Sequence, residues 1–273
     1  MEDVVRDGGK SDGRGRSLDE AARARFTETL AAGAAALGVD LTADQIGRCV
    51  RYTDLLLEAN ARTNLTRIVE PGEVAAKHFV DSLAVFRACP EVPLNARVAD
   101  VGTGAGFPGI ALKIARPDLQ LVLVDSLRKR ITFLANLTKD LGLTGVTLRH
   151  ARAEDAGRDP ELRDRHDLVV ARAVAALPTL LEWCGPLVRP RGGRFVALKT
   201  PAVEDELARS GDAARALRLR LAGDVVLEIP APVSADEGAA EPPLARRLLV
   251  WEKQGATPPA FPRRAAEIAA KPL

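Results

Sequence analysis

The sequence is poor in the residue types that build disulfide frameworks and metal centres. Its 273 residues include three cysteines and three histidines. The cysteines, Cys49, Cys89 and Cys184, are odd in number and lack CxxC spacing, which is typical of reduced thiols rather than of a disulfide scaffold or a zinc site. The histidines are equally scattered along the chain. We therefore predict no bound metal.

Long apolar runs and a strong charge imbalance are also missing. No run approaches the length of a membrane span, and the acidic, glycine-rich N-terminus is unlike a signal peptide, which predicts a cytoplasmic protein. The net charge is only +2, so contacts with RNA would have to come from local clusters of basic residues. Hydrophobic residues make up 47% and charged residues 28%, an ordinary globular composition with a sizeable core.

Composition divides the chain into four parts. Residues 1–16 carry charges, glycine and serine with little apolar patterning, which predicts a disordered tail. Residues 17–93 show helical spacing and form a predicted helical N-terminal lead-in. Residues 94–255 alternate strand and helix patterns and form the main domain. Residues 256–273 are basic and rich in proline, and we expect this tail to pack loosely.

Within the lead-in, capping boxes predict two helix starts, at Ser17–Glu20 and at Thr42–Gln45. Residues 60–66 are polar and predict a loop, and residues 74–87 again read as helix. The main domain has regular strand–helix alternation, which indicates a Rossmann-like, doubly wound, mostly parallel sheet with helices on both faces. The predicted strands are 97–101, 119–124, 146–150, 168–172 and 193–198. The predicted helices are 109–115, 128–141, 177–184 and 203–219. Two later strands, 224–229 and 246–252, predict an antiparallel pair at the sheet edge.

The turn after the first predicted strand carries the clearest functional signal. Residues 100–109 read DVGTGAGFPG, in which alternating glycines permit a sharp turn and a close approach of backbone to ligand. Pro108 suits the first turn of a helix. Strand, glycine loop and helix start together indicate the nucleotide-binding corner of an α/β sheet.

Two cofactor classes fit this corner. The spacing Gly104–Gly109 satisfies the dinucleotide fingerprint, so an NAD-linked enzyme is one reading. Asp100 favours S-adenosylmethionine, because its carboxylate suits the ammonium of a methionine moiety and would repel a pyrophosphate. The glycines also begin directly after the strand. Asp125 ends the second strand, where an acid binds ribose hydroxyls in either class; a tight turn with an incidental acid is the simplest alternative.

Several blocks of the sequence resemble the glucose-inhibited division protein B family, the 16S rRNA guanine-N7 methyltransferases. The matching blocks are Asn64–Thr66, His78–Leu83, Asp100–Gly109, Asp125–Arg130, Ala151–Glu154, Ala171–Ala173, Leu198–Lys199, Phe261–Arg264 and Lys271–Leu273. The resemblance runs from about residue 20 to the C-terminus. It implies the class I methyltransferase fold with an N-terminal helical extension, S-adenosyl-L-methionine as cofactor, and 16S rRNA in the small ribosomal subunit or an assembly intermediate as partner.

The resemblance and the glycine loop together predict a set of cofactor-binding residues. They are Gly102, Gly104, Phe107, Asp125, Ala153, Glu154 and Arg172. The resemblance implies that Gly102 and Phe107 touch the cofactor and that Ala153 and Glu154 bracket the adenine. Phe107 also fits a core position, and Glu154 fits a first-turn acid favoured by the helix dipole. Arg172, placed by the resemblance at the cofactor and target-base pocket, ends an apolar strand, where a charge needs a partner or a ligand.

Methylation of guanine N7 needs no general base, because the nitrogen already offers a lone pair. The sequence shows no His–acid pair or cysteine nucleophile pattern, so we assign no catalytic residue and expect the rate to come from placement. Phe107 or Arg172 is expected to stack on the target base. The alternatives are a methyltransferase of the same fold acting on a protein or small molecule, or a non-catalytic binding protein. The sequence Ala-Arg-Ala-Val at 171–174 lacks the Asn-Pro-Pro-Tyr pattern of amino-group methylation. We expect a monomer.

Basic clusters are the candidate RNA contacts. They are Arg128–Arg130; Arg189, Arg191 and Arg194 with Lys199; Arg246–Arg247; and Arg263–Arg264 with Lys271. For any one cluster, the alternative is a solvated face. The pair Arg246–Arg247 lies within a predicted strand, where charges commonly protect a sheet edge.

Overall fold

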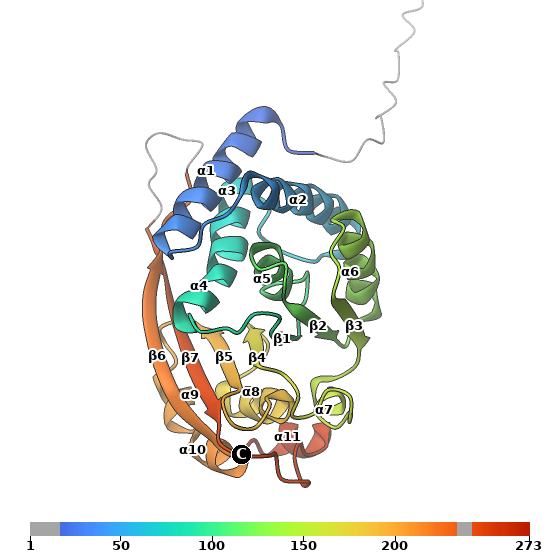
Figure 1. Cartoon of the computed structure of the whole chain (residues 1–273), viewed down its shortest axis with the longest axis vertical. Helices are drawn as coiled ribbons and strands as arrows, with labels where there is room; N and C mark the ends of the chain where they lie inside the picture. Colours follow the sequence, from blue (N-terminus) through green and yellow to red (C-terminus); the bar gives the residue numbers. More distant parts are fainter. Residues whose placement is uncertain (1–16, 234–241) are drawn as a thin grey trace, which may run out of the picture.

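One sheet organises the computed structural model, which describes residues 17–233 and 242–273 (Figure 1); the predicted tail at 1–16 lies outside these residues. Within them the sheet has seven strands in the order β3-β2-β1-β4-β5-β7-β6. The strands are β1 (Arg97–Val101), β2 (Gln120–Asp125), β3 (Val146–His150), β4 (Leu168–Arg172), β5 (Arg194–Lys199), β6 (Leu219–Ile229) and β7 (Leu244–Lys253). Neighbours among β1 to β5 are parallel and β7 is antiparallel to both β5 and β6. The predicted mostly parallel α/β sheet is confirmed.

Helices cover both faces of this sheet (Figure 1). Those that follow the glycine loop are α5 (Gly109–Ala115), α6 (Arg128–Asp140), α7 (Ala153–Ala156), α8 (Leu177–Cys184), α9 (Glu204–Ala208), α10 (Gly211–Ala216) and α11 (Ala265–Ala270), with a 3₁₀ turn η2 (Gly185–Leu187) after α8. The single helix predicted for 203–219 is wrong. Instead, α9 ends at Ala208 and α10 begins at Gly211. Between them the Ser210 hydroxyl donates to the Leu207 carbonyl, and serine and glycine at 210–211 are poor helix formers. None of the described helices is long and apolar enough to cross a membrane.

The lead-in helices are α1 (Glu20–Ala36), α2 (Ala43–Thr63), α3 (Pro71–Val74), a π-helical turn η1 (Ala75–Val80) and α4 (Asp81–Ala88). The capping box at Thr42–Gln45 is confirmed, with both reciprocal bonds present. The box predicted at Ser17–Glu20 is wrong, because Asp19 caps α1 by accepting from the Ala22 amide at 2.8 Å. The loop predicted at 60–66 begins later, since α2 continues to Thr63.

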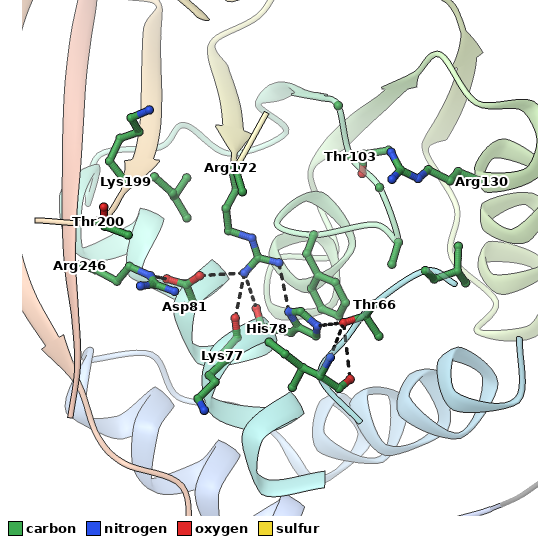
Figure 2. Close-up of a pocket in the computed structure, with 18 of the residues that line it drawn as sticks. Thr66, Lys77, His78, Asp81, Thr103, Arg130, Arg172, Lys199, Thr200 and Arg246 are labelled. Atoms are coloured by element: carbon green, nitrogen blue, oxygen red, sulfur yellow. Dashed lines mark hydrogen bonds and ion pairs between the residues drawn. The ribbon is translucent and has the colours of Figure 1, made fainter. Parts of the chain in front are cut away.

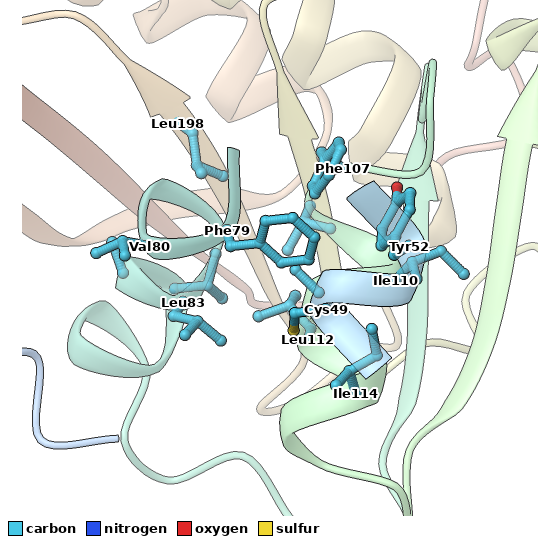
Figure 3. Close-up of a cluster of buried hydrophobic side chains, with 14 of the residues drawn as sticks. Cys49, Tyr52, Phe79, Val80, Leu83, Phe107, Ile110, Leu112, Ile114 and Leu198 are labelled. Atoms are coloured by element: carbon cyan, nitrogen blue, oxygen red, sulfur yellow. The ribbon is translucent and has the colours of Figure 1, made fainter. Parts of the chain in front are cut away.

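The lead-in shares one hydrophobic core with the sheet (Figure 3). Phe26 and Tyr52 each pack edge-on against Phe79, with ring centroids 5.5 and 5.3 Å apart. These rings belong to the same buried cluster as Val98 of β1 and Val170 of β4. The other face of the sheet packs against α7, α8 and α10. The N-terminal helices therefore form one wall of the cavity at the carboxyl ends of these strands.

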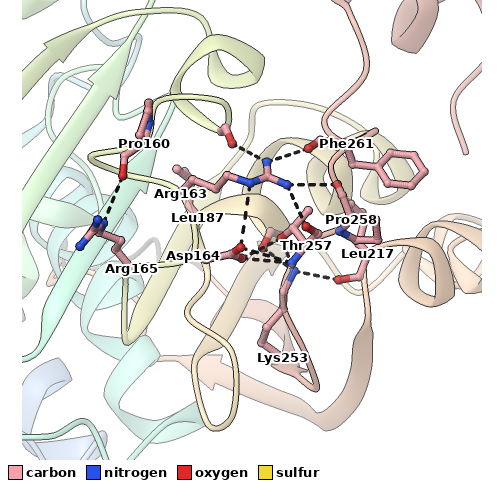
Figure 4. A network of polar contacts seen from close by, with 12 residues as sticks. Pro160, Arg163, Asp164, Arg165, Leu187, Leu217, Lys253, Thr257, Pro258 and Phe261 are labelled. Atoms are coloured by element: carbon pink, nitrogen blue, oxygen red, sulfur yellow. Dashed lines mark hydrogen bonds and ion pairs between the residues drawn. The ribbon is translucent and has the colours of Figure 1, made fainter.

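The C-terminal segment is held by a polar network (Figure 4). The Arg163 guanidinium donates to the carbonyls of Thr257 and Phe261 at 2.9 and 2.7 Å. The buried Lys253 ammonium donates to the Thr257 hydroxyl at 2.7 Å, and burial lowers the pKa of Lys253 to about 8. Arg263 forms an ion pair with the fully buried Glu182 at 2.7 Å. The loose packing predicted for residues 256–273 is therefore wrong.

Candidate cofactor and target-base site

Two adjoining cavities lie at the carboxyl ends of the parallel strands, where α/β sheets bind ligands. The larger, of about 450 Å³, is lined by residues that end or follow β1, β4 and β5 and by the loop and helices before β1. The smaller, of about 270 Å³, lies between the ends of β1 and β2 and the start of α7. Gly102, Arg130 and Ala173 line both cavities. The two cavities thus form neighbouring compartments of one site.

Hydrogen bonds to the Asp100 carboxylate fix the conformation of the glycine loop. One carboxylate oxygen of Asp100 accepts from the Thr103 hydroxyl at 2.7 Å and from the Gly109 amide at 2.8 Å. A Cβ on Gly109 would lie 2.8 Å from that oxygen, so only glycine permits this closure. Gly104 has φ +61°, and a Cβ there would meet only the Gly102 carbonyl at 4.0 Å, leaving backbone open to the larger cavity.

The second carboxylate oxygen of Asp100 is buried and has no hydrogen-bond partner in the described part of the chain. Burial is the main reason that the pKa of Asp100 is raised to about 6, opposed by its bonds to Thr103 and Gly109. A buried, half-satisfied carboxylate is costly unless a donor reaches it. Asp100 therefore has one carboxylate oxygen beneath the glycine loop that could accept a hydrogen bond from a ligand.

The smaller cavity contains the predicted adenosine residues. Asp125 is buried, accepts from the Gly104 amide at 3.0 Å and pairs with Arg130 at 3.1 Å. Ala153 and Glu154 line the same cavity, and Glu154 accepts from the Arg152 guanidinium at 2.9 Å. The structure brings together all seven residues predicted to bind the cofactor: Gly102, Gly104, Phe107 and Arg172 line the larger cavity, and Gly102, Asp125, Ala153 and Glu154 the smaller.

Phe107 is a core residue and a cavity wall at once. Its ring stacks on Tyr52 and on His78, with centroids 4.8 Å apart in each pair, and only 5% of the residue is exposed. The Arg172 guanidinium carbon lies 5.5 Å from the ring centroid. Since its neighbours already cover most of the ring, Phe107 offers little surface for stacking on a base.

Arg172 belongs to an ion cluster that the sequence patterns did not predict (Figure 2). Its guanidinium pairs at 2.8 Å with Asp81, which also pairs with Arg246 at 2.7 Å. The same guanidinium donates to the Lys77 carbonyl at 3.1 Å. Asp81 stands in the block that starts at His78, and an acid in an otherwise apolar helical stretch is the signal that could have identified it.

His78 is held neutral beside this cluster. Burial and the nearby Arg172 charge lower the pKa of His78 to about 3. Its Nε2 lies 2.8 Å from the Thr66 hydroxyl and its Nδ1 lies 3.4 Å from the Arg172 guanidinium. Both ring nitrogens are therefore engaged by protein groups.

Only some residues of the predicted basic clusters line the larger cavity. Arg246 points into the cavity, while Arg247 pairs with Asp224 at 2.8 Å on the opposite side of β7. The edge-charge reading of this pair is wrong, because β7 lies between β5 and β6. Arg194 begins β5 and Lys199 ends it, so that predicted cluster is split between opposite ends of a strand. Lys199 lines the larger cavity and pairs with Glu206 at 2.6 Å.

Comparison with known proteins agrees with this architecture. A family model described as GidB, rRNA small subunit methyltransferase G, matches residues 45–222. The ribosomal RNA small subunit methyltransferase G of Desulfitobacterium hafniense (strain Y51) is 43% identical over 237 residues, which are 87% of this chain and 93% of that protein. The protein of the same name from Desulforamulus reducens is 41% identical over 248 residues, 91% of this chain and 98% of that one. The chain belongs to this family.

Membership of the GidB family confirms the resemblance and favours a methyltransferase over the NAD-linked alternative. All seven predicted cofactor residues fall within the matched segment, whereas Arg246 lies beyond it. Among solved structures, a precorrin-6y C5,15-methyltransferase from Geobacter metallireducens is similar with a TM-score of 0.49 and 14% identity, covering 70% of this chain and 92% of that one.

Proposed function

We propose that this GidB-family protein transfers the methyl group of S-adenosyl-L-methionine to N7 of a guanosine in 16S rRNA, in the small ribosomal subunit or an assembly intermediate. The observation that carries the proposal is the pairing of two compartments. The smaller cavity is lined by the acids Asp125 and Glu154, and it adjoins the larger cavity, where Arg172, Lys199 and Arg246 line the wall together with the glycine loop. The first suits a cationic nucleoside cofactor and the second suits an anionic polynucleotide.

The residues present fit the cofactor. The bare backbone at Gly104 leaves room for it. In the smaller cavity, Asp125 would accept hydrogen bonds from ribose hydroxyls, and Ala153 and Glu154 would bracket the adenine. The unpartnered oxygen of Asp100 suits the methionine ammonium, which would satisfy a buried acceptor. When bound, the cofactor supplies an electrophilic methyl group on a sulfonium.

The cavity chemistry suits a reaction without proton abstraction. Guanine N7 already carries a lone pair, so accepting the methyl group that the cofactor would supply requires no residue of this chain to remove a proton. The cavity imidazole, His78, has a pKa near 3 and both nitrogens engaged, so it is organised as a wall rather than as a base. Rate would then come from in-line placement, which is worth about 7–11 kcal/mol in well-oriented reactions.

The other parts of the proposal concern the partner and the cell compartment. Arg172 and Arg246 present guanidinium groups at the target end, and guanidinium forks bind phosphate and carbonyl oxygens. We keep the cytoplasm as the predicted location, since ribosomal subunits assemble there in bacteria, and a monomer as the predicted state.

The deciding experiment is labelled-methyl transfer to small ribosomal subunits from cells that lack this protein, followed by mapping of the label by nucleotide. One labelled guanine, with the label on N7, would establish reaction, substrate and cofactor together. Measurable cofactor binding with no label on subunits, assembly intermediates or naked RNA would reject the rRNA substrate and favour a protein or small-molecule acceptor.

A further inference from the structure

Asp81 is a buried carboxylate on the wall of the target compartment. It begins α4, directly after the π-helical turn, and is fully buried. One of its oxygens pairs with Arg172 Nη1 at 2.8 Å and the other with Arg246 Nε at 2.7 Å (Figure 2). These arginines belong to β4 and β7, which are not neighbours because β5 lies between them. A single carboxylate thus brings together two distant segments.

The three charges depend on one another. Two guanidinium groups held by one carboxylate leave one positive charge in excess at the cavity wall, and without the carboxylate they would repel each other. A buried carboxylate without a cation would itself be strongly unfavourable. The positions of both arginines are therefore set by Asp81 rather than by either strand alone.

Each arginine keeps hydrogen-bond capacity for a ligand. Arg172 uses Nη1 on Asp81 and on two helix carbonyls, and Arg246 uses Nε on Asp81 and Nη1 on the Ala245 carbonyl. Arg172 Nε and Arg246 Nη2 have no acceptor in the described segments, and both residues line the cavity. The cluster is built to present these donors to an entering group that carries oxygen acceptors.

We propose that Asp81 is a positioning residue for methyl transfer, orienting Arg172 and Arg246 toward the RNA nucleotide that enters the cavity. This inference rests on the proposed function. Asp81 does not touch the reacting atoms; it acts through the two arginines. If instead it were only a counter-charge, removing its charge would strengthen RNA binding and leave turnover unchanged.

The test uses the full chain, small ribosomal subunits as substrate, and the variants Asp81→Asn and Asp81→Glu. Asp81→Asn adds one positive charge to the cavity. We expect kcat to fall about 100-fold, as for a displacement of about 1 Å in the reacting geometry, while KM for RNA does not rise and cofactor affinity by calorimetry stays unchanged. Asp81→Glu keeps the charge but displaces both guanidinium groups, and we expect its kcat to fall as well.

Glu182→Gln is the matched control, because Glu182 is also a fully buried carboxylate paired with an arginine but lines neither cavity. It should lower stability without changing kcat. Wild-type kcat in Asp81→Asn, an equal kcat loss in Glu182→Gln, or a parallel loss of cofactor affinity overturns the inference. If Asp81→Asn does not fold, wild-type kcat in Asp81→Glu overturns it. Absence of RNA methylation by the wild type rejects the proposed function and, because the inference rests on that function, rejects the inference as well.

Discussion

The two compartments of the site are built in opposite ways. The smaller compartment, proposed for the adenosine part of the cofactor, comes from consecutive strand–helix units, with Gly102 after β1, Asp125 ending β2 and Glu154 following β3. The target compartment depends on Asp81, whose partners Arg172 and Arg246 stand 91 and 165 residues away. The smaller compartment is built from residues that follow three successive strands along the chain. The target compartment is built from residues far apart in the sequence, which meet only in the folded protein.

Two buried acids near these compartments differ in the same way. Asp100 beneath the glycine loop has one oxygen without a partner among the described residues, whereas Asp81 has a cation on each oxygen. A lone buried acid favours a cationic ligand, and an acid outnumbered by arginines favours an anionic one. Under the proposed function, this difference agrees with a cationic cofactor near Asp100 and with RNA beside Asp81.

The largest expected effect is the loss of cofactor binding at the glycine loop. Gly104→Val places a branched side chain in the larger cavity at a backbone φ of +61°. We expect no measurable cofactor binding by calorimetry, because the added side chain would occupy the space that the bare backbone leaves for the cofactor.

Gly38→Val is the control for backbone strain. Gly38 has φ +72° at the end of α1, and no atom lies within 4 Å of the point that a Cβ would occupy there, so this variant should lose stability and keep cofactor binding. Cofactor binding by Gly104→Val at wild-type affinity would disprove the assignment of the glycine loop to the cofactor.

Arg172→Ala tests the target compartment. We expect methyl transfer to fall by about 10²–10³, the usual loss when a placed donor is removed from an active site. The loss of folding stability should be too small to account for the loss of activity, because Asp81 keeps its ion pair with Arg246. Single-turnover methylation and thermal unfolding are measured on the same preparation. A collapse in melting temperature that accounts for the activity loss would mean that the arginine is structural.

The raised pKa of Asp100 predicts a pH-dependent cost to the stability of the fold. The native state keeps this proton up to about pH 6, while the unfolded chain releases it near pH ~3.9. Native Asp100 therefore binds more protons between these values, so its contribution to stability falls as pH rises from about 4 to 6 and stays lost above. His78 and His166, with native pKa values near 3 and 4, act in the opposite direction below pH 6.5.

Asp100→Asn isolates this contribution, because both histidines remain in the variant. Relative to wild type it should gain stability progressively from about pH 4 to 6, reaching on the order of 2–3 kcal/mol at about pH 7. Urea unfolding at a series of pH values gives the difference curve. Its cofactor affinity should fall, because an amide cannot neutralise the ammonium. A flat difference curve would show that Asp100 titrates normally in the fold.

The sequence predicted the local features of the fold and site better than the contacts between distant segments. Residues 100–109, Asp125 and the strands β1 to β5 were predictable to within a residue, because turn chemistry and strand patterning are local. The pairing of Asp81 with Arg246 was not, because an ion pair across 165 residues leaves no periodic signal. The edge-charge reading of Arg246–Arg247 failed for a similar reason. It assumed that β7 lies at the edge, while the chain inserts it between β5 and β6.

The smallest expected effect is also the sharpest, since it compares adjacent residues. Arg246 and Arg247 differ in position by one residue, so their side chains point to opposite faces of β7. Arg246→Ala should lower RNA methylation about tenfold, the loss of roughly one charged hydrogen bond at about 1.4 kcal/mol, and leave cofactor affinity unchanged. Arg247→Ala breaks the pairs with Glu204 and Asp224 on the other face and should leave methylation within about twofold of wild type. Equal losses in both variants would mean that β7 contributes only diffuse positive charge, and that the target compartment does not depend on which face an arginine occupies.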